Sequence, residues 1–234
     1  MKVFLIGYMG SGKSVIAKEL AALLSCPFVD TDEWIEGRRC KTISEIFEEE
    51  GEESFRTLEN ECLEFLMEQE NMVIATGGGM ACHHHNIDLM NEMGETVYLN
   101  ASVDLLTDRL WKEKQERPKL DNYHSREDLN SFISIHINTR LVDYQKSTHT
   151  VVIEQKSIQD IAEEIKSILR KSKVIAMIGV SSEKKGEDKK NLKRKPANVV
   201  MKYMQNFGYK VIPINPFAVG EIVNGEPMVE SLDK

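Results

Sequence analysis

A glycine-rich octapeptide near the start of the chain carries the clearest chemical signal in the sequence. Residues 7–14 read Gly-Tyr-Met-Gly-Ser-Gly-Lys-Ser and match the pattern G-x-x-x-x-G-K-[ST] in full. Such glycines let main-chain N–H groups converge on a phosphate, and a helix beginning near Lys13 adds the positive end of its dipole. We expect Lys13 to reach the β- and γ-phosphates of a nucleotide and Ser14 to ligate Mg²⁺. A chance glycine turn is the alternative, but an apolar strand pattern before the loop and a helical pattern after it argue against that. The loop residues expected to bind ATP are Gly10, Ser11, Gly12, Lys13, Ser14 and Val15.

Two carboxylates follow the second apolar run of the chain. Asp30 and Asp32 come just after residues 28–29, which we interpret as a strand. Open α/β sheets bind ligands at the carboxyl ends of their strands, so these side chains should lie beside the phosphate loop. One carboxylate can support the metal while the other accepts a proton from a substrate hydroxyl. Alternatively, Asp32 only caps a helix that starts near Glu33.

Glycines and arginines supply further candidates. Residues 77–79 are three glycines after the apolar run 72–75, and they indicate either close approach of a ligand or an ordinary turn. Arg56, Arg117 and Arg140 stand out among basic residues, although a lone arginine is usually a solvated surface group. Arg117 precedes a proline in a polar, turn-rich stretch, which is typical of a lid that brings an arginine to the γ-phosphate.

Strand and helix patterns alternate along the first 170 residues, which predicts a parallel α/β sheet with helices on both faces. The expected strands are residues 3–6, 28–29, 72–75, 97–99 and 150–153. Helical patterns include residues 43–70 and 132–142. A further helix should begin at a capping box formed by Ser157 and Asp160.

The pattern restarts near residue 171. A strand over 174–180, a polar basic loop, a helix from Pro196 to a cap at Gly208 and a strand over 211–214 form one βαβ unit and a tail. Residues 171–234 hold 12 Lys+Arg and 7 Asp+Glu, a net charge of +5, whereas the preceding residues carry −13. This asymmetry indicates two units. Because the basic excess lies in one loop-like run, it does not predict nucleic-acid binding.

Composition bounds the remaining possibilities. The chain is 41% hydrophobic and 29% charged, as in soluble globular proteins, and no apolar run approaches the roughly 20 residues that span a bilayer. The four cysteines form no CxxC pair, so we expect reduced thiols and a cytoplasmic location. His83, His84 and His85 suggest either a metal site or, as we favour, an exposed loop or helix start. We expect a monomer that binds neither nucleic acid nor a membrane.

The motifs together resemble the shikimate kinase family over residues 1 to about 170. The resemblance rests on the phosphate loop, Asp30-Thr31-Asp32 with Ile35-Glu36, Gly51-Glu52 with Phe55-Arg56 and Glu59, Thr76 with the three glycines, and Arg117-Pro118. It implies a P-loop NTPase fold of the nucleoside-monophosphate-kinase type, with a five-stranded parallel sheet. It also implies transfer of the ATP γ-phosphate to the 3-hydroxyl of shikimate, on the route to chorismate and aromatic amino acids.

The resemblance assigns roles to individual residues. Asp32 would contact the ring hydroxyls and act as base, and Arg117 would close from the lid onto the phosphates. Asp30 would lie in the water shell of Mg²⁺, and Arg109 would lie near the adenine. The residues implied to hold the substrate's carboxylate end are Arg56, Arg140, Gly77, Gly78 and Gly79. A planar arginine suits a carboxylate because it offers two parallel hydrogen bonds.

The second unit, residues 173–234, resembles the beginning of a CoA-binding, Rossmann-like domain and covers about half of one. Gly179-Val180-Ser181 lacks the full dinucleotide fingerprint. The basic run 184–195 could meet a nucleotide phosphate, or it is a solvated loop. CoA is therefore a possible ligand of this partial βαβ unit, and we expect domains over 1–170 and 173–234.

Two other functions remain open at this point. The first is a different small-metabolite kinase, such as a gluconate kinase. The second is a non-enzymatic nucleotide-binding or CoA-sensing protein with a decayed kinase half. Intact Lys13, Ser14, Asp30 and Asp32 argue against decay.

Overall fold

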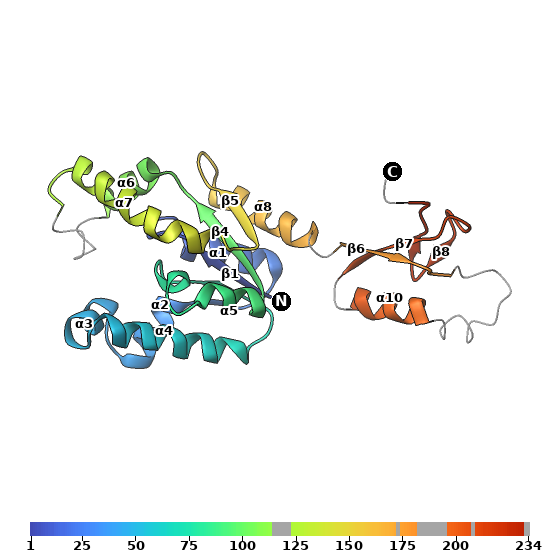
Figure 1. Cartoon of the computed structure of the whole chain (residues 1–234), viewed down its shortest axis with the longest axis horizontal. Helices are drawn as coiled ribbons and strands as arrows, with labels where there is room; N and C mark the ends of the chain where they lie inside the picture. Colours follow the sequence, from blue (N-terminus) through green and yellow to red (C-terminus); the bar gives the residue numbers. More distant parts are fainter. Residues whose placement is uncertain (114–122, 172–173, 182–195, 207–208, 232–234) are drawn as a thin grey trace. The chain divides into compact units, whose positions relative to one another are not determined.

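The chain forms two compact units. The computed structural model describes residues 1–113, 123–171, 174–181, 196–206 and 209–231. Contacts between residues divide it into Met1–Ser167 and Ile168–Lys234, and each unit has its own β-structure (Figure 1). Each unit is described by itself below.

A five-stranded sheet organises the first unit, as the sequence predicted. Its strands are β1 (Lys2–Ile6), β2 (Phe28–Asp30), β3 (Met72–Ala75), β4 (Glu95–Asn100) and β5 (His149–Val152). The spatial order is β2-β3-β1-β4-β5, and every neighbouring pair is parallel. The β3 side chains and four of the five in β1 are buried, which explains why these strands appear in the sequence as continuous apolar runs.

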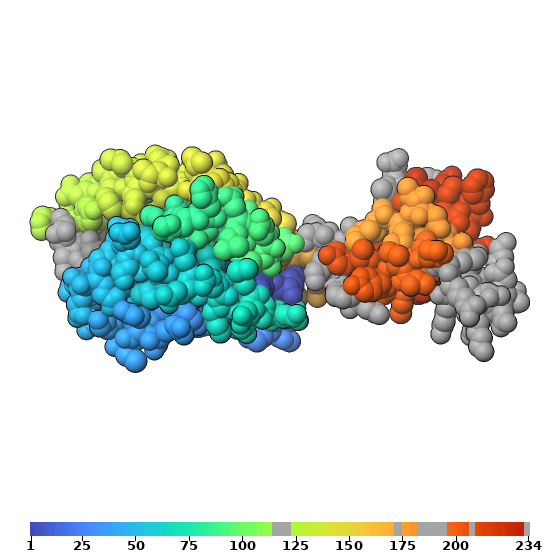
Figure 2. Space-filling view, turned by 60° about the horizontal axis from the view of Figure 1, so that its bottom comes forward, coloured from blue at the N-terminus to red at the C-terminus, as the bar shows by residue number. Residues whose placement is uncertain are grey.

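Helices cover the sheet, with α7 along one side and α4 along the other in Figure 1. Figure 2 shows α4 and α5, which contact each other, side by side on one face of this unit. The helical segments are α1 (Lys13–Leu24), α2 (Thr31–Arg39), α3 (Ile43–Glu49), α4 (Gly51–Met67), η1 (Met80–Cys82), α5 (Asn86–Met93), α6 (Val103–Lys112), α7 (Arg126–Tyr144) and α8 (Ile158–Lys171). Within the described ranges, no helix has the length and apolar character needed to cross a membrane.

Helix boundaries follow local capping chemistry. The capping box before α8 is confirmed, because Ser157 Oγ accepts from Asp160 N and donates to its carboxylate. The helical pattern over 43–70 is two helices, because Gly51 adopts a φ of +82° and breaks the run. Helix α7 begins at Arg126, six residues before the expected 132, because Ser125 Oγ accepts the N–H of Asp128 at 3.0 Å.

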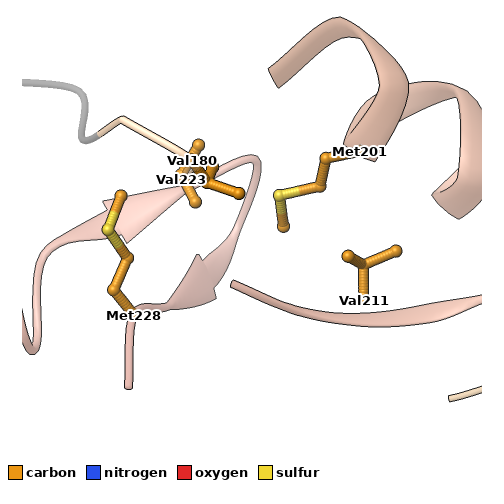
Figure 3. Close-up of a cluster of buried hydrophobic side chains, with 5 residues drawn as sticks. All are labelled: Val180, Met201, Val211, Val223 and Met228. Carbon is orange, nitrogen blue, oxygen red and sulfur yellow. The ribbon is translucent and has the colours of Figure 1, made fainter. Parts of the chain in front are cut away.

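The second unit contains the expected βαβ arrangement. Strands β6 (Val174–Ile178) and β7 (Lys210–Ile214) are parallel, and α10 (Pro196–Asn206) lies between them in the chain. Its core is a cluster of Val180, Met201, Val211, Val223 and Met228 (Figure 3). The sequence reading missed an antiparallel pair, β8 (Ile222–Val223) and β9 (Glu226–Pro227). Asn224-Gly225, both at positive φ, is a common hairpin turn and could have revealed it.

We predict that Gly94→Ala destabilises the first unit by about 1–3 kcal/mol. A Cβ at Gly94 would lie 2.4 Å from the carbonyl oxygen of Lys2, so the main chain would have to move. Urea unfolding followed by far-UV circular dichroism measures the change. Gly37→Ala in α2 is the control, because a Cβ there meets nothing within 4 Å. Equal stability of the two variants would contradict the prediction.

Candidate active site

The phosphate loop connects β1 to α1 in a conformation that depends on glycine. Gly10 and Gly12 have φ values of +80° and +86°, and Gly12 is the N-cap of α1. Lys13 is buried, and its Nζ donates to the carbonyl oxygens of Gly7 at 2.9 Å and Tyr8 at 3.0 Å. Ser11 Oγ is a buried polar atom without a hydrogen-bond partner among the described residues. A bound phosphate oxygen would satisfy such an atom, so the loop fits an oxyanion.

A pocket of about 470 Å³ opens in front of this loop. It joins the loop to the carboxyl ends of β2 and β3, to α6 and to the start of α8. The lining residues are Met9, Gly10, Gly12, Lys13, Ser14, Val15, Ile16, Asp30, Asp32, Thr76, Gly78, Arg109, Glu113, Lys156, Ile158 and Ile161. Arg109 Nη1 also donates to the carbonyl oxygen of Gly10 at 3.0 Å, so this arginine lies over the loop. Sequence reasoning did not single out Glu113 and Lys156.

Ser14 and Asp30 meet beside the loop. Ser14 Oγ donates to Asp30 Oδ2 at 2.5 Å, while Asp30 Oδ1 accepts the N–H groups of Asp32 and Glu33. Asp30 is thus the N-cap of α2, and the alternative that Asp32 caps a helix near Glu33 is wrong. A hydroxyl and a carboxylate oxygen are the donors that Mg²⁺ prefers, so this pair fits the ion.

Two of the three adjacent histidines, His84 and His85, are exposed. They lie between η1 and α5, and His84 and His85 have positive φ values. Among the described residues, no group of three or more His, Cys, Asp or Glu side chains is arranged to hold a metal ion.

Asp32 and Glu59 lie against Gly77. A Cβ on Gly77 would come within 2.6 Å of Asp32 Oδ1 and 3.3 Å of Glu59 Oε1, so only glycine fits there without a shift. The Gly77 N–H donates to Thr31 Oγ1 at 2.8 Å. Gly77 therefore provides space, while its N–H holds the loop to the start of α2.

Arg56 is buried between two carboxylates on its own helix. Its Nη1 donates to Glu59 Oε2 at 2.8 Å and its Nη2 to Glu52 Oε1 at 2.7 Å. The Glu59 side chain is only 1% exposed, whereas that of Glu52 is 63% exposed. Burial raises the pKa of Glu59 to about 7, more than the neighbouring Arg56 lowers it. A Cβ on Gly79 would be 3.0 Å from Arg56 Nη1, so the guanidinium lies directly against residues 77–79, called the glycine segment below.

Arg140 reaches the same glycine segment from α7. Its Nη1 donates to the carbonyl oxygen of Gly78 at 2.9 Å, and Tyr144 Oη donates to the same oxygen at 2.6 Å. Besides the larger effect of burial, both Arg56 and Arg140 lower the pKa of His83, as expected where two cations converge. The structure thus brings together Arg56, Arg140, Gly78 and Gly79. Arg117 lies outside the described residues.

A contact that sequence reasoning missed joins the phosphate loop to α7. Tyr8 Oη lies 2.8 Å from His136 Nδ1, and the Tyr8 side chain is buried. The two residues are 128 positions apart, and neither belongs to the fixed positions of a motif. No periodicity or spacing in the sequence signals this pair.

Comparison with known proteins matches one family model to each part of the chain. The family model for shikimate kinase matches residues 9–170, and the model for a CoA binding domain matches residues 173–234. The shikimate kinase of Azobacteroides pseudotrichonymphae is 42% identical over 70% of this chain and 96% of its own length. That of Parabacteroides distasonis is 42% identical over 72% and 99%.

Solved structures extend the comparison. Shikimate kinase from Bacteroides thetaiotaomicron superposes with a TM-score of 0.68 at 38% identity, covering 72% of this chain and 98% of its own. Shikimate kinase from Acinetobacter baumannii, solved in complex with shikimate, gives 0.65 at 32% identity over 73% and 93%. These matches and the parallel sheet confirm the resemblance drawn from the motifs. The chain belongs to the shikimate kinase family.

Proposed function

We propose that this chain transfers the γ-phosphoryl group of ATP to the 3-hydroxyl of shikimate, as a step toward chorismate and aromatic amino acids. The observation that carries the proposal is the convergence of Arg56 and Arg140 on the glycine segment beside the phosphate loop. Two arginines next to a phosphate cradle suit an alcohol that also bears a carboxylate. We expect the enzyme to act in the cytoplasm as a monomer, without nucleic acid or a membrane.

The substrate's two ends would meet different residues. Arg56 and Arg140 bind the carboxylate, and Gly78 and Gly79 leave room for it. Asp32 accepts the proton of the attacking hydroxyl, because its carboxylate lies between the glycine segment and the nucleotide pocket. Gly77 supports this arrangement by admitting the Asp32 carboxylate against the main chain.

The nucleotide would lie in the pocket in front of the loop. Main-chain N–H groups from Gly10 to Val15 and the Lys13 ammonium neutralise the phosphates. Arg109, which lines this pocket, would lie near the adenine, and Arg117, outside the described residues, would close onto the phosphates. Ser14 would hold Mg²⁺, and Asp30 would support the ion through water. When bound, the ion neutralises charge that develops on the phosphate oxygens.

For the second unit, we propose a boundary near residues 170–173 and binding of CoA by residues 173–234. The family match names this activity, and parallel strands bind ligands at their carboxyl ends. At that end, Asn198 bonds both main-chain groups of Ser181, and Asn215 Nδ2 donates to the carbonyl oxygen of Val180. These contacts fix the main chain where a nucleotide would approach.

The first experiment measures ADP release from the full chain with and without shikimate, and with gluconate in its place. We expect release that depends on shikimate, and a loss of at least about 10²-fold in kcat for Asp32→Asn. Asp88→Asn, an exposed carboxylate paired with His85, is the matched control. Release that gluconate supports equally would favour another small-metabolite kinase, and no Mg·ATP binding at millimolar levels would leave a non-enzymatic protein.

A second prediction follows from the raised pKa of Glu59. The folded protein keeps this proton up to about pH 7, whereas an unperturbed glutamate loses it near 4.5. Between these values the folded state binds more protons than the unfolded state, so Glu59 makes the free energy of unfolding decrease as pH rises. Glu59→Gln cannot release a proton. The unfolding free energy of the unaltered chain minus that of the variant should therefore fall from about pH 5 to about pH 8.

Urea unfolding in steps across that pH range measures this difference. The same subtraction for Glu64→Gln, an exposed residue on the same helix, is the control. A difference that stays constant or increases with pH would show that Arg56 keeps Glu59 ionised throughout.

A third prediction concerns CoA. Calorimetric titration of the full chain with CoA should release or absorb heat even when saturating Mg·ADP fills the kinase pocket. The ADP arm is needed because CoA itself contains an adenine nucleotide. Heat that disappears with Mg·ADP would place CoA in the kinase pocket and reject the proposed second site.

A further inference from the structure

The main chain of Tyr8 is part of the phosphate loop, and its side chain reaches α7, the helix that carries Arg140. Its carbonyl oxygen accepts from Lys13 Nζ at 3.0 Å, while its Oη lies 2.8 Å from His136 Nδ1 on α7. The Tyr8 and His136 rings meet edge to face, with centroids 5.5 Å apart at 85°. Tyr8 is 1% exposed and His136 is half-buried, so this contact is partly shielded from water.

The same tyrosine ring also contacts Arg140. The guanidinium carbon lies 5.6 Å from the ring centroid, within the range of a cation–π interaction. Arg140 and His136 are four residues apart on α7 and therefore lie on one face of the helix. With the Gly78 carbonyl oxygen accepting from Nη1, the guanidinium is held from two directions.

His136 is itself supported by a neighbouring aromatic side chain. The Phe132 ring lies 5.0 Å from that of His136, and Tyr123 lies 4.7 Å from Phe132. Burial, and to a lesser degree Arg140, lowers the pKa of His136, so the imidazole is neutral near pH 7. A neutral His136 imidazole can bond the tyrosine hydroxyl, and it carries no charge that would draw an anion away from Arg140.

We propose that Tyr8 and His136 are positioning residues that hold Arg140 in the orientation needed to bind the substrate carboxylate. This inference rests on the proposed function, in which Arg140 binds that carboxylate. An arginine side chain loses rotational freedom when it binds a ligand, and part of this cost disappears if the guanidinium is already held in place. The Tyr8–His136 pair provides that restraint from the phosphate loop, in addition to the bond from Arg140 to the Gly78 carbonyl oxygen.

Steady-state kinetics of Tyr8→Phe test the proposal. This variant keeps the ring over Arg140 and removes the bond to His136, so we expect KM for shikimate to rise about 2–10-fold, as for loss of one hydrogen bond. The values of kcat and KM for ATP should change less than about 2-fold. Tyr8→Leu, which also removes the ring, should raise KM for shikimate further. Equal increases in both KM values would indicate general damage to the loop and overturn the proposal.

Two further variants separate the possible outcomes. His136→Leu removes the tyrosine's hydrogen-bond partner without altering the loop sequence, and it should reproduce the Tyr8→Phe effect. Tyr98→Phe removes another largely buried hydroxyl, which bonds Asn100, and should leave KM for shikimate unchanged. Thermal unfolding of each variant checks that it folds.

A double-mutant cycle with Arg140→Ala completes the test. If Tyr8 acts through Arg140, Tyr8→Phe should add nothing to the KM for shikimate in the Arg140→Ala background. Should Arg140→Ala alone leave this KM unchanged, the proposed carboxylate site itself is wrong. Should Arg140→Ala raise it while Tyr8→Phe does not, only the positioning role is wrong.

Discussion

The parallel pairing of β1 with β3 is the constraint on which the site depends. Leu5 pairs with Ala75, and Thr76 donates to the carbonyl oxygen of Leu5 through both its N–H and its hydroxyl. This register places the phosphate loop beside the glycine segment, so closely that a Cβ on Gly78 would lie 3.1 Å from the N of Met9. The phosphate loop and the glycine segment are thus in direct main-chain contact. A shift of one residue in the register would separate them and turn the strands' side chains to the wrong faces.

The two carboxylate partners of Arg56 differ in how readily they can be replaced. Arg56 is bonded to Glu59, which is buried, and to Glu52, which is largely exposed. Loss of the buried bond to Glu59 would leave a buried donor and acceptor unsatisfied and cost about 1–3 kcal/mol, whereas an exposed pair contributes about 0–1 kcal/mol. If Arg56 binds the substrate carboxylate as proposed, that carboxylate would replace Glu52 at Nη2 at low cost. Glu59 would keep the guanidinium in place before and after the substrate binds.

Local signals in the sequence predicted much of this architecture. The octapeptide, the carboxylates after β2 and the Ser157 capping box each depend on residues a few positions apart, and the structure contains each of these features. Strands β1 and β3 were recognisable because burial on both faces makes residues 3–6 and 72–75 continuously apolar. The sequence predicted helices over 43–70 but not the position of the break at Gly51, because helical periodicity continues on both sides of a residue whose φ the sequence does not reveal.

The contacts that escaped prediction are those made between distant segments. Tyr8 occupies a variable position of the octapeptide, and His136 looks like any polar residue of an amphipathic helix. Their bond forms because the sheet places the loop beside α7. No periodicity in the sequence encodes this tertiary contact. In the same way, the sequence marked Gly77 as a possible ligand contact, whereas its N–H bonds Thr31. Motifs thus predicted several of the residues that the structure brings together, and packing decided which contacts their main-chain groups make.

The net charge of residues 1–170 is −13, which is unfavourable for binding ATP and shikimate, because both are anions. Screening resolves this conflict. At physiological salt the Debye length is about 8 Å, so exposed carboxylates farther from the pocket contribute little to the potential inside it. Lys13, Arg56 and Arg140 are partly or fully withdrawn from water, and their fields act over contact distances that salt does not screen. Affinity for two anions therefore depends on where a few cations are held, which is why the contacts that hold Arg140 and Arg56 in place matter more than the total charge.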